Sequence, residues 1–279
     1  MSLISKIKQY KKYIIISIII IIILGLGLGL GLGLGLKSES GSGSGYIPIP
    51  LMCKDNSLCV FPKCDPVPGI ICPIKVACVG DSITYGIGSN MKTDSYSAQL
   101  ANLLGDKYAL CNYGCPGTAM CTNGAMPYYG DYGYNSTVNG LPNIIILMLG
   151  TNDAAGNAGA SAGTQDYFEA QTTFLITQFL NIISKPTIYI CAPPPMYFSG
   201  GTFNNILNTV VIPAIKNVAN QQQNIGNKVN FIDVNSALPR PSVDPNAPLP
   251  DFMYDALHPN KNGYKMIADK VYETLINQA

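Results

Sequence analysis

Charged residues are scarce in this chain of 279 residues, where Lys, Arg, Asp and Glu make up 12% of the sequence, about half of the usual share. Hydrophobic residues make up 47%, so the low charge does not indicate disorder and the chain can build a full core. From residue 40 onwards, 12 basic residues stand against 15 acidic ones, which gives a formal charge of −3, and Arg240 is the only arginine. Nucleic-acid binding depends on clustered Lys and Arg, so the composition excludes a nucleic-acid partner and disfavours a dedicated phosphate clamp.

The residues of a common zinc site are also missing. His258 is the only histidine, and the nine cysteines include no C-x-x-C pair, so we expect neither a metal nor a cofactor. Four cysteines lie in a proline-rich stretch, which favours a disulfide-pinned strap outside the cytosol over a zinc site: Cys53, Cys59, Cys64 and Cys72. A second group comprises Cys111, Cys115 and Cys121. Cys78 and Cys191 lie within apolar runs and are expected to be buried thiols, and the odd total leaves at least one cysteine free or bonded to another chain.

A long uncharged segment, residues 13–36, follows a basic start. As a helix it would be about 36 Å long, enough to cross a bilayer. The basic residues before it place the amino terminus in the cytoplasm and the rest of the chain outside the cell or in a lumen. A cleaved signal peptide, which would make the protein secreted, is the alternative, but the segment is long for one and has no clear A-x-A site.

The composition changes along the chain predict four parts. Residues 1–36 form the basic start and the transmembrane anchor, and residues 37–46 form a Gly/Ser tether with too little apolar surface to fold. Residues 47–74 form the Cys/Pro-rich strap. Residues 75–279 form the folded domain.

The folded domain alternates between strand and helix patterns. Short apolar runs predict strands over residues 75–80, 108–113, 143–149, 187–191 and 229–234. Helical periodicity follows over residues 95–104, 166–180, 204–220 and 260–277. This alternation predicts a three-layer α/β/α sandwich around a five-stranded parallel sheet. In such sheets ligands bind at the carboxyl ends of the strands, so functional residues should follow the strands directly.

Polar residues that could take part in catalysis lie at three places, two of them directly after predicted strands. Ser82 follows the first predicted strand in a G-D-S-I-T turn, and Asn152 follows the third in G-T-N-D. His258 precedes the last helix, with Asp255 three residues earlier. Each feature has an ordinary explanation, because serine caps helices or binds phosphate at such turns and asparagine forms turns.

Together these features support one chemistry. A serine is a poor nucleophile until an imidazole takes its proton, and the imidazole in turn needs a carboxylate to orient it. Asp255 has the spacing to accept from Nδ1–H of His258. If Ser82 and His258 meet across the strand ends, Asn152 can donate to a developing oxyanion.

The motifs resemble those of the SGNH hydrolases, the GDSL-type esterases and lipases, over residues 75–277. The resemblance implies the flavodoxin-like SGNH fold, Ser82 as nucleophile with its N–H as an oxyanion donor, and Asp255 and His258 as the rest of the triad. It also implies that Gly117, in the block N-Y-G-C-P-G-T at 112–118, and Asn152 complete the oxyanion hole. Pro116, where many relatives carry Ser, contributes no donor but leaves the N–H of Gly117 intact.

Within that superfamily the sequence is most similar to carbohydrate O-acetylesterases of the sialate and xylan acetylesterase-like type. The similarity rests on L-G-T-N-D at 149–153, C-A-P-P-P at 191–195 and H-P-N-K-N-G at 258–263.

The segment between residues 119 and 140 contains four tyrosines that could form a platform for sugar rings, or could be an ordinary exposed loop: Tyr128, Tyr129, Tyr132 and Tyr134. No long apolar helix suited to gripping lipid lies beside the site. We therefore expect a serine esterase that removes acetyl or another short acyl group from a small molecule or a glycan. The alternatives are a membrane-tethered lipase or lysophospholipase, and a non-catalytic glycan-binding protein on a hydrolase scaffold, which would have little reason to keep all five site residues.

Overall fold

A computed structural model describes residue 61 and residues 72–198, 201–242, 244 and 246–278. In this part of the chain no helix combines the length and the apolar character needed to cross a bilayer. The predicted span at 13–36, the tether and most of the strap lie outside the described residues. The four-part division and the membrane anchor therefore stay predictions.

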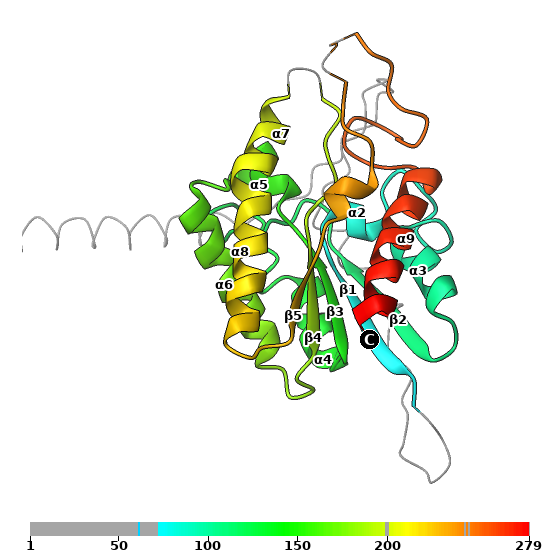
Figure 1. Ribbon diagram of the computed structural model, residues 1–279, viewed down its shortest axis with the longest axis vertical. Helices are drawn as coiled ribbons and strands as arrows, with labels where there is room; N and C mark the ends of the chain where they lie inside the picture. The colour runs from blue at the N-terminus through cyan, green and yellow to red at the C-terminus, as the bar shows by residue number, and fades with distance from the viewer. Residues whose placement is uncertain (1–60, 62–71, 199–200, 243, 245, 279) are drawn as a thin grey trace, which may run out of the picture. The chain divides into compact units, whose positions relative to one another are not determined.

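The described residues form a five-stranded, fully parallel sheet in the order β2-β1-β3-β4-β5 (Figure 1). The strands are β1 (Ile74–Gly80), β2 (Tyr108–Gly114), β3 (Ile144–Met148), β4 (Thr187–Cys191) and β5 (Val229–Ile232). All five predicted strands are thus confirmed, with ends that shift by at most two residues. β1 lies in the middle because it pairs with both β2 and β3.

Helices cover both faces of this sheet. Figure 1 shows α6 (Gln165–Leu180) and α8 (Ile212–Asn224) on one side and α3 (Tyr96–Leu104) and α9 (Lys261–Gln278) on the other. Successive side chains of a strand point to opposite faces, so Ala77 and Val79 join the core under α6 and α8, while Val76 and Cys78 join the core under α3 and α9. The predicted three-layer sandwich is confirmed.

Shorter helices follow the strand ends or connect the layers. They are α2 (Ser82–Tyr85), α4 (Tyr132–Gly140), α5 (Thr151–Ala155) and α7 (Thr202–Ile206), with 3-10 turns at Asn157–Gly159 and Val234–Ala237. A π-helical turn at Leu207–Val211 joins α7 to α8. Helical structure here thus starts two residues earlier and ends four residues later than the predicted 204–220.

The cysteines divide into free and bonded ones. Cys78, Cys191 and Cys121 are buried free thiols, so the expectation for Cys78 and Cys191 is confirmed. Burial raises the pKa of Cys78 to about 12, which leaves that thiol unreactive at neutral pH. Cys72, Cys111 and Cys115 are disulfide-bonded. The predicted pinning of the strap stays a prediction, because its other cysteines lie outside the described residues.

The end of β2 packs without a gap against the turn that follows β1. The N–H of Cys115 donates to the carbonyl oxygen of Gly80 at 2.8 Å. A Cβ on Gly114 would lie 2.2 Å from the backbone nitrogen of Tyr85 and 2.7 Å from two further backbone atoms. Backbone atoms cannot move aside as a flexible side chain can, so only glycine fits at this position.

We expect Gly114→Ala to lower the free energy of unfolding by about 3 kcal/mol, because the added methyl group forces two backbone segments apart. Gly226→Ala is the control: its φ of +84° strains alanine, but its Cβ would meet nothing within 4 Å, so it should cost only about 1 kcal/mol. Urea denaturation of both variants and the wild type measures the difference. Equal losses in the two variants would contradict the packing argument.

Candidate active site

Ser82 lies where β1 turns sharply into a one-turn helix. It is the first residue of α2, and Asp81 caps that helix by accepting the N–H of Ile83 on Oδ1 at 2.9 Å. Gly86 ends the helix in the left-handed conformation with φ 103°. The side chain of Ser82 is held at the carboxyl edge of the sheet and is 7% exposed.

Asp255 and His258 lie in a tight loop before α9. The loop is closed by a bridge between Met253 and Pro259. Oδ1 of Asp255 accepts the backbone N–H groups of Leu257 at 2.8 Å and His258 at 2.7 Å, and Oδ2 lies 2.9 Å from Nδ1 of His258. Partial burial raises the pKa of Asp255, but these hydrogen bonds outweigh burial and lower it overall, so the carboxylate stays charged.

The tertiary structure joins this loop to Ser82. Nε2 of His258 lies 3.0 Å from Oγ of Ser82, although the two residues are 176 positions apart. When Nδ1 carries the proton that it donates to Asp255, Nε2 is free to accept from the serine hydroxyl. Ser82, His258 and Asp255 therefore form one continuous series of hydrogen bonds.

Asn152 lies next to this series, at the end of the neighbouring strand. It is the second residue of α5, whose N-cap Gly150 has φ 116°, and it is 3% exposed. Its Nδ2 donates to the carbonyl oxygen of Thr118 at 2.8 Å, directly after the buried Gly117. An amide NH₂ group has a second hydrogen, which remains for another acceptor. The structure thus brings the loop of Gly117 and the helix of Asn152 together.

Two residues that the sequence did not single out hold these donors in place. Nδ2 of Asn157 donates to Oδ1 of Asn152 at 2.9 Å and so fixes which way the amide points. The buried carboxylate of Asp153 accepts the backbone N–H groups of Met120 at 2.9 Å and Cys121 at 2.8 Å. Asp153 is readable as part of G-T-N-D, but nothing in the sequence connects it with residues 120 and 121.

Asp81 is buried directly behind Ser82. It is 1% exposed, and its Oδ2 has no hydrogen-bond partner among the described residues. Burial raises its pKa to about 7 and the charge of Asp153 raises it further, against the lowering effects of the Ile83 N–H and of the nearby Thr151 hydroxyl. In the described part of the chain no three His, Cys, Asp or Glu side chains gather to hold a metal ion.

The proposed tyrosine platform is wrong for Tyr128. This side chain is fully buried, and its hydroxyl donates to the carbonyl oxygen of Tyr113 at 2.8 Å, so it cannot stack on a sugar. Tyr134 packs against the core and against the ring of Tyr129, with centroids 4.9 Å apart. Tyr129 and Tyr132 are each 38% exposed and remain candidates. The spacing of the tyrosines in the sequence did not indicate which of their rings are buried in the core.

Most of this chain matches a known protein family. The model of the GDSL-like lipase/acylhydrolase family matches residues 78–266. The acetylxylan esterase of Xylanibacter ruminicola is 26% identical over 212 residues, an alignment that covers 70% of this chain and 42% of that protein. The chain therefore spans less than half the length of this curated relative.

Several solved structures share the fold. Est24, a carbohydrate acetylesterase from Sinorhizobium meliloti, superposes with a TM-score of 0.51 at 16% identity, covering 74% of this chain and 100% of its own. The aryl esterase of M. smegmatis gives 0.57 at 17% identity, with 74% and 100% covered. A family two carbohydrate esterase from Clostridium thermocellum, solved with cellohexaose, gives 0.53 at 18% identity, with 74% and 64% covered. The predicted resemblance to the superfamily is confirmed.

The raised pKa of Asp81 leads to a prediction about stability. An aspartate titrates near 4 in an unfolded chain and Asp81 titrates at about 7 in the fold, so only the unfolded state releases this proton between those values. Raising the pH through this window therefore favours unfolding, and the free energy of unfolding should fall from pH 5 to pH 7 because of this group.

Asp81→Asn keeps the cap on Ile83 and removes the titration, so its stability should change less with pH than that of the wild type. Urea denaturation at pH 5, 6, 7 and 8 measures this slope. The control, Asp106→Asn, changes an exposed aspartate and should keep the slope of the wild type. An unchanged slope in Asp81→Asn would show that Asp81 is ionised throughout.

Proposed function

This chain belongs to the GDSL-like lipase/acylhydrolase family, and on that premise we propose that it is a serine esterase that removes acetyl or another short acyl group from carbohydrate. The observation that carries the proposal is the hydrogen-bonded series from Ser82 through His258 to Asp255, with 3.0 Å and 2.9 Å between the joined atoms. A hydroxyl, an imidazole and a carboxylate in this order are the requirements of nucleophilic catalysis by serine.

The first half of the reaction forms an acyl-enzyme. Nε2 of His258 takes the proton from Oγ of Ser82 while Oγ forms a bond to the carbonyl carbon of the ester. The carbonyl oxygen becomes an oxyanion that accepts from the N–H groups of Ser82 and Gly117 and from the second hydrogen on Nδ2 of Asn152. The intermediate then breaks its bond to the alcohol oxygen, which leaves with the proton from His258.

The second half repeats these steps with water. His258 takes a proton from the water, whose oxygen bonds to the acyl carbon, and then returns a proton to Oγ of Ser82 as the acid leaves. Asp255 does not change its protonation state. Its lowered pKa keeps it charged, and the charge stabilises the imidazolium that forms in both halves.

The partly buried Asn157 and the buried Asp153 position the oxyanion donors without touching the substrate. Asn157 prevents the amide of Asn152 from turning its oxygen toward the developing negative charge. Asp153 holds the backbone of Met120 and Cys121, and so fixes the loop that begins at Gly117. Donors that are already aimed need no reorganisation in the transition state, which is the main source of their effect.

The named relatives support an acetyl group and a carbohydrate. A protein similar to this chain over 70% of its length bears the name acetylxylan esterase. Both the short acyl group and the sugar are proposals for this chain. The placement of the enzyme outside the cytosol, on the anchor at 13–36, is likewise a proposal that rests on the sequence.

Ser82→Ala should lower kcat for p-nitrophenyl acetate by at least about a thousandfold, because the covalent step is lost while little packing changes. A fluorophosphonate probe should label the wild type and fail to label the variant. Ser184→Ala, at the amino end of β4 and far along the strands from the site, is the control and should keep both activity and labelling. Activity retained in a folded Ser82→Ala variant would refute the assignment.

The length of the acyl group separates the proposed esterase from a lipase. We expect kcat/KM for p-nitrophenyl esters to be highest for acetate and to fall as the chain is lengthened to decanoate, because a small acyl pocket excludes each added methylene. The series is measured with the purified protein at fixed ionic strength and below the micellar concentration of each ester. A preference for octanoate or longer chains would favour the lipase alternative.

A further inference from the structure

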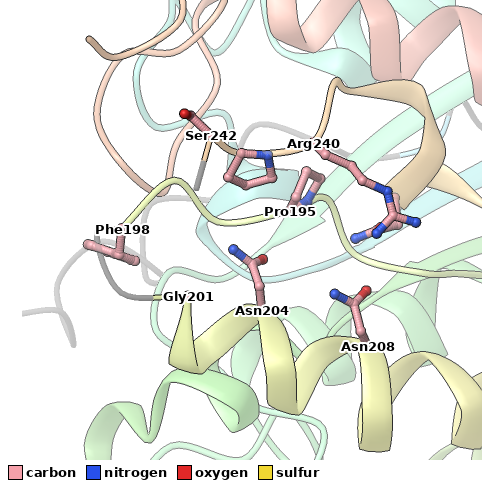
Figure 2. Close-up of a pocket in the computed structure, with 9 residues that line it drawn as sticks. Pro195, Phe198, Gly201, Asn204, Asn208, Arg240 and Ser242 are labelled. Atoms are coloured by element: carbon pink, nitrogen blue, oxygen red, sulfur yellow. The ribbon is translucent and has the colours of Figure 1, made fainter. Parts of the chain in front are cut away.

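A pocket lies at the same edge of the sheet as Ser82, beside the carboxyl ends of β4 and β5. It has a volume of about 430 Å³, within the range of small-ligand pockets. Its walls come from the segment after β4, from α7 and the π-helical turn, and from the loop after β5 (Figure 2). The residues that matter here are Pro195, Phe198, Asn204, Asn208, Arg240 and Ser242.

Hydrogen bonds join one wall of this pocket to the catalytic loop. The backbone N–H of Tyr197 donates to the carbonyl oxygen of Ala256, between Asp255 and His258, at 2.7 Å. Oδ1 of Asn204 accepts the N–H of Met196 at 2.9 Å, so the same segment is tied to α7 on its other side. The segment after β4 is thus hydrogen-bonded both to α7, which lines the pocket, and to the loop that carries Asp255 and His258.

The positive charge in the pocket has no acidic partner among the described residues. Arg240 is the only arginine of the sequence, and its guanidinium makes no ion pair or hydrogen bond with any described residue. No Asp or Glu lies among the lining residues. Figure 2 shows Arg240 on one side of the pocket, with the amides of Asn204 and Asn208 pointing up from the helix on the other. The amide of Asn204 is already bonded through Oδ1 and Nδ2 to the backbone of Met196. The pocket therefore offers the exposed guanidinium of Arg240 and the amide of Asn208, with no carboxylate among its lining residues.

We infer that this pocket binds the carboxylate of a uronic acid in an acylated glycan, an inference that rests on the proposed esterase function. The planar guanidinium of Arg240 presents paired N–H donors that match the two oxygens of a carboxylate. The amide of Asn208 supplies a further donor across the pocket. The ring of Phe198, 40% exposed and held edge-on by Phe203 at 5.6 Å, offers an apolar face for the sugar ring.

The position of the pocket relative to Ser82 determines how far the carboxylate lies from the ester in the substrate. β4 lies two strands from β1, which corresponds to about 10 Å at the usual strand spacing. The carboxylate and the ester therefore belong to different sugar units of one oligosaccharide. The enzyme then selects acidic glycans through a group remote from the bond it breaks, and that binding contributes to kcat/KM.

The test compares two acetylated oligosaccharides that differ only in charge: one carries a free uronic acid, and the other carries the methyl ester of the same uronic acid. The wild type should show a kcat/KM about tenfold or more higher for the free acid, as expected for a hydrogen-bonded charge pair. Arg240→Gln should remove this preference, so that the ratio of the two kcat/KM values falls to about one, while p-nitrophenyl acetate hydrolysis stays unchanged. Lys216→Gln removes an exposed positive charge from α8 outside the pocket and should keep the preference of the wild type for the free acid.

A ratio near one in the wild type, or an equal ratio in Arg240→Gln and the wild type, would overturn the inference. Binding provides a readout that does not depend on catalysis. Calorimetric titration of the Ser82→Ala variant with the deacetylated acidic oligosaccharide should give a heat of binding that Arg240→Gln and the methyl ester each weaken. Binding without ester hydrolysis by the wild type would reject the proposed esterase and keep the pocket, whereas hydrolysis without charge-dependent binding would reject the pocket alone.

Discussion

The parallel arrangement of the strands is the constraint on which the site depends. Because every strand of the sheet runs the same way, the residues that follow β1, β3, β4 and β5 all reach one edge of the sheet. β1 lies between β2 and β3, so the turn with Ser82 adjoins both the loop of Gly117 and the helix of Asn152. The contact of Gly114 with the backbone of Tyr85 then leaves the serine turn no room to move. A rigid sheet thus supports residues that chemistry requires within a few ångströms of each other.

Buried carboxylates give this edge its polar framework, at a cost in stability. Burial raises the pKa of Asp153, and the two backbone N–H groups that it accepts lower that pKa only in part. Asp81 accepts one backbone N–H on Oδ1, and its Oδ2 makes no hydrogen bond with a described residue. Burial disfavours the charged form of Asp81 more than the N–H of Ile83 stabilises it, so its pKa rises to about 7. Asp255 has the opposite environment, with three hydrogen bonds at a partly exposed position, and stays ionised. The same side-chain chemistry therefore serves different roles according to burial and hydrogen bonding.

The structure favours Arg240 over the tyrosines of residues 128–134 as the basis of substrate recognition. Tyr128 belongs to the core, and Tyr134 supports Tyr129 by packing, so the tyrosine-rich segment is largely a structural element. Arg240 lies in a hollow joined to the catalytic loop and has no acidic partner there. Arg240 is exposed and is the only charged residue among the described residues that line this pocket, so the recognition that we propose rests on charge and not on aromatic stacking.

The sequence by itself determined the sheet, its four long helices and the identity of the residues at the strand ends, but not the short helices α2, α4 and α5. Short apolar runs and helical periods depend on local spacing, and the G-D-S, G-T-N-D and D-x-x-H motifs each carry their chemistry within a few neighbouring residues. The tertiary structure alone decided that Nε2 of His258 reaches Ser82 across 176 positions, that Asn157 and Asp153 hydrogen-bond to the amide of Asn152 and to the backbone of residues 120 and 121, and that Tyr128 is buried. Those contacts join segments whose separation along the chain carries no periodic signal, so only the packing of the layers brings them together.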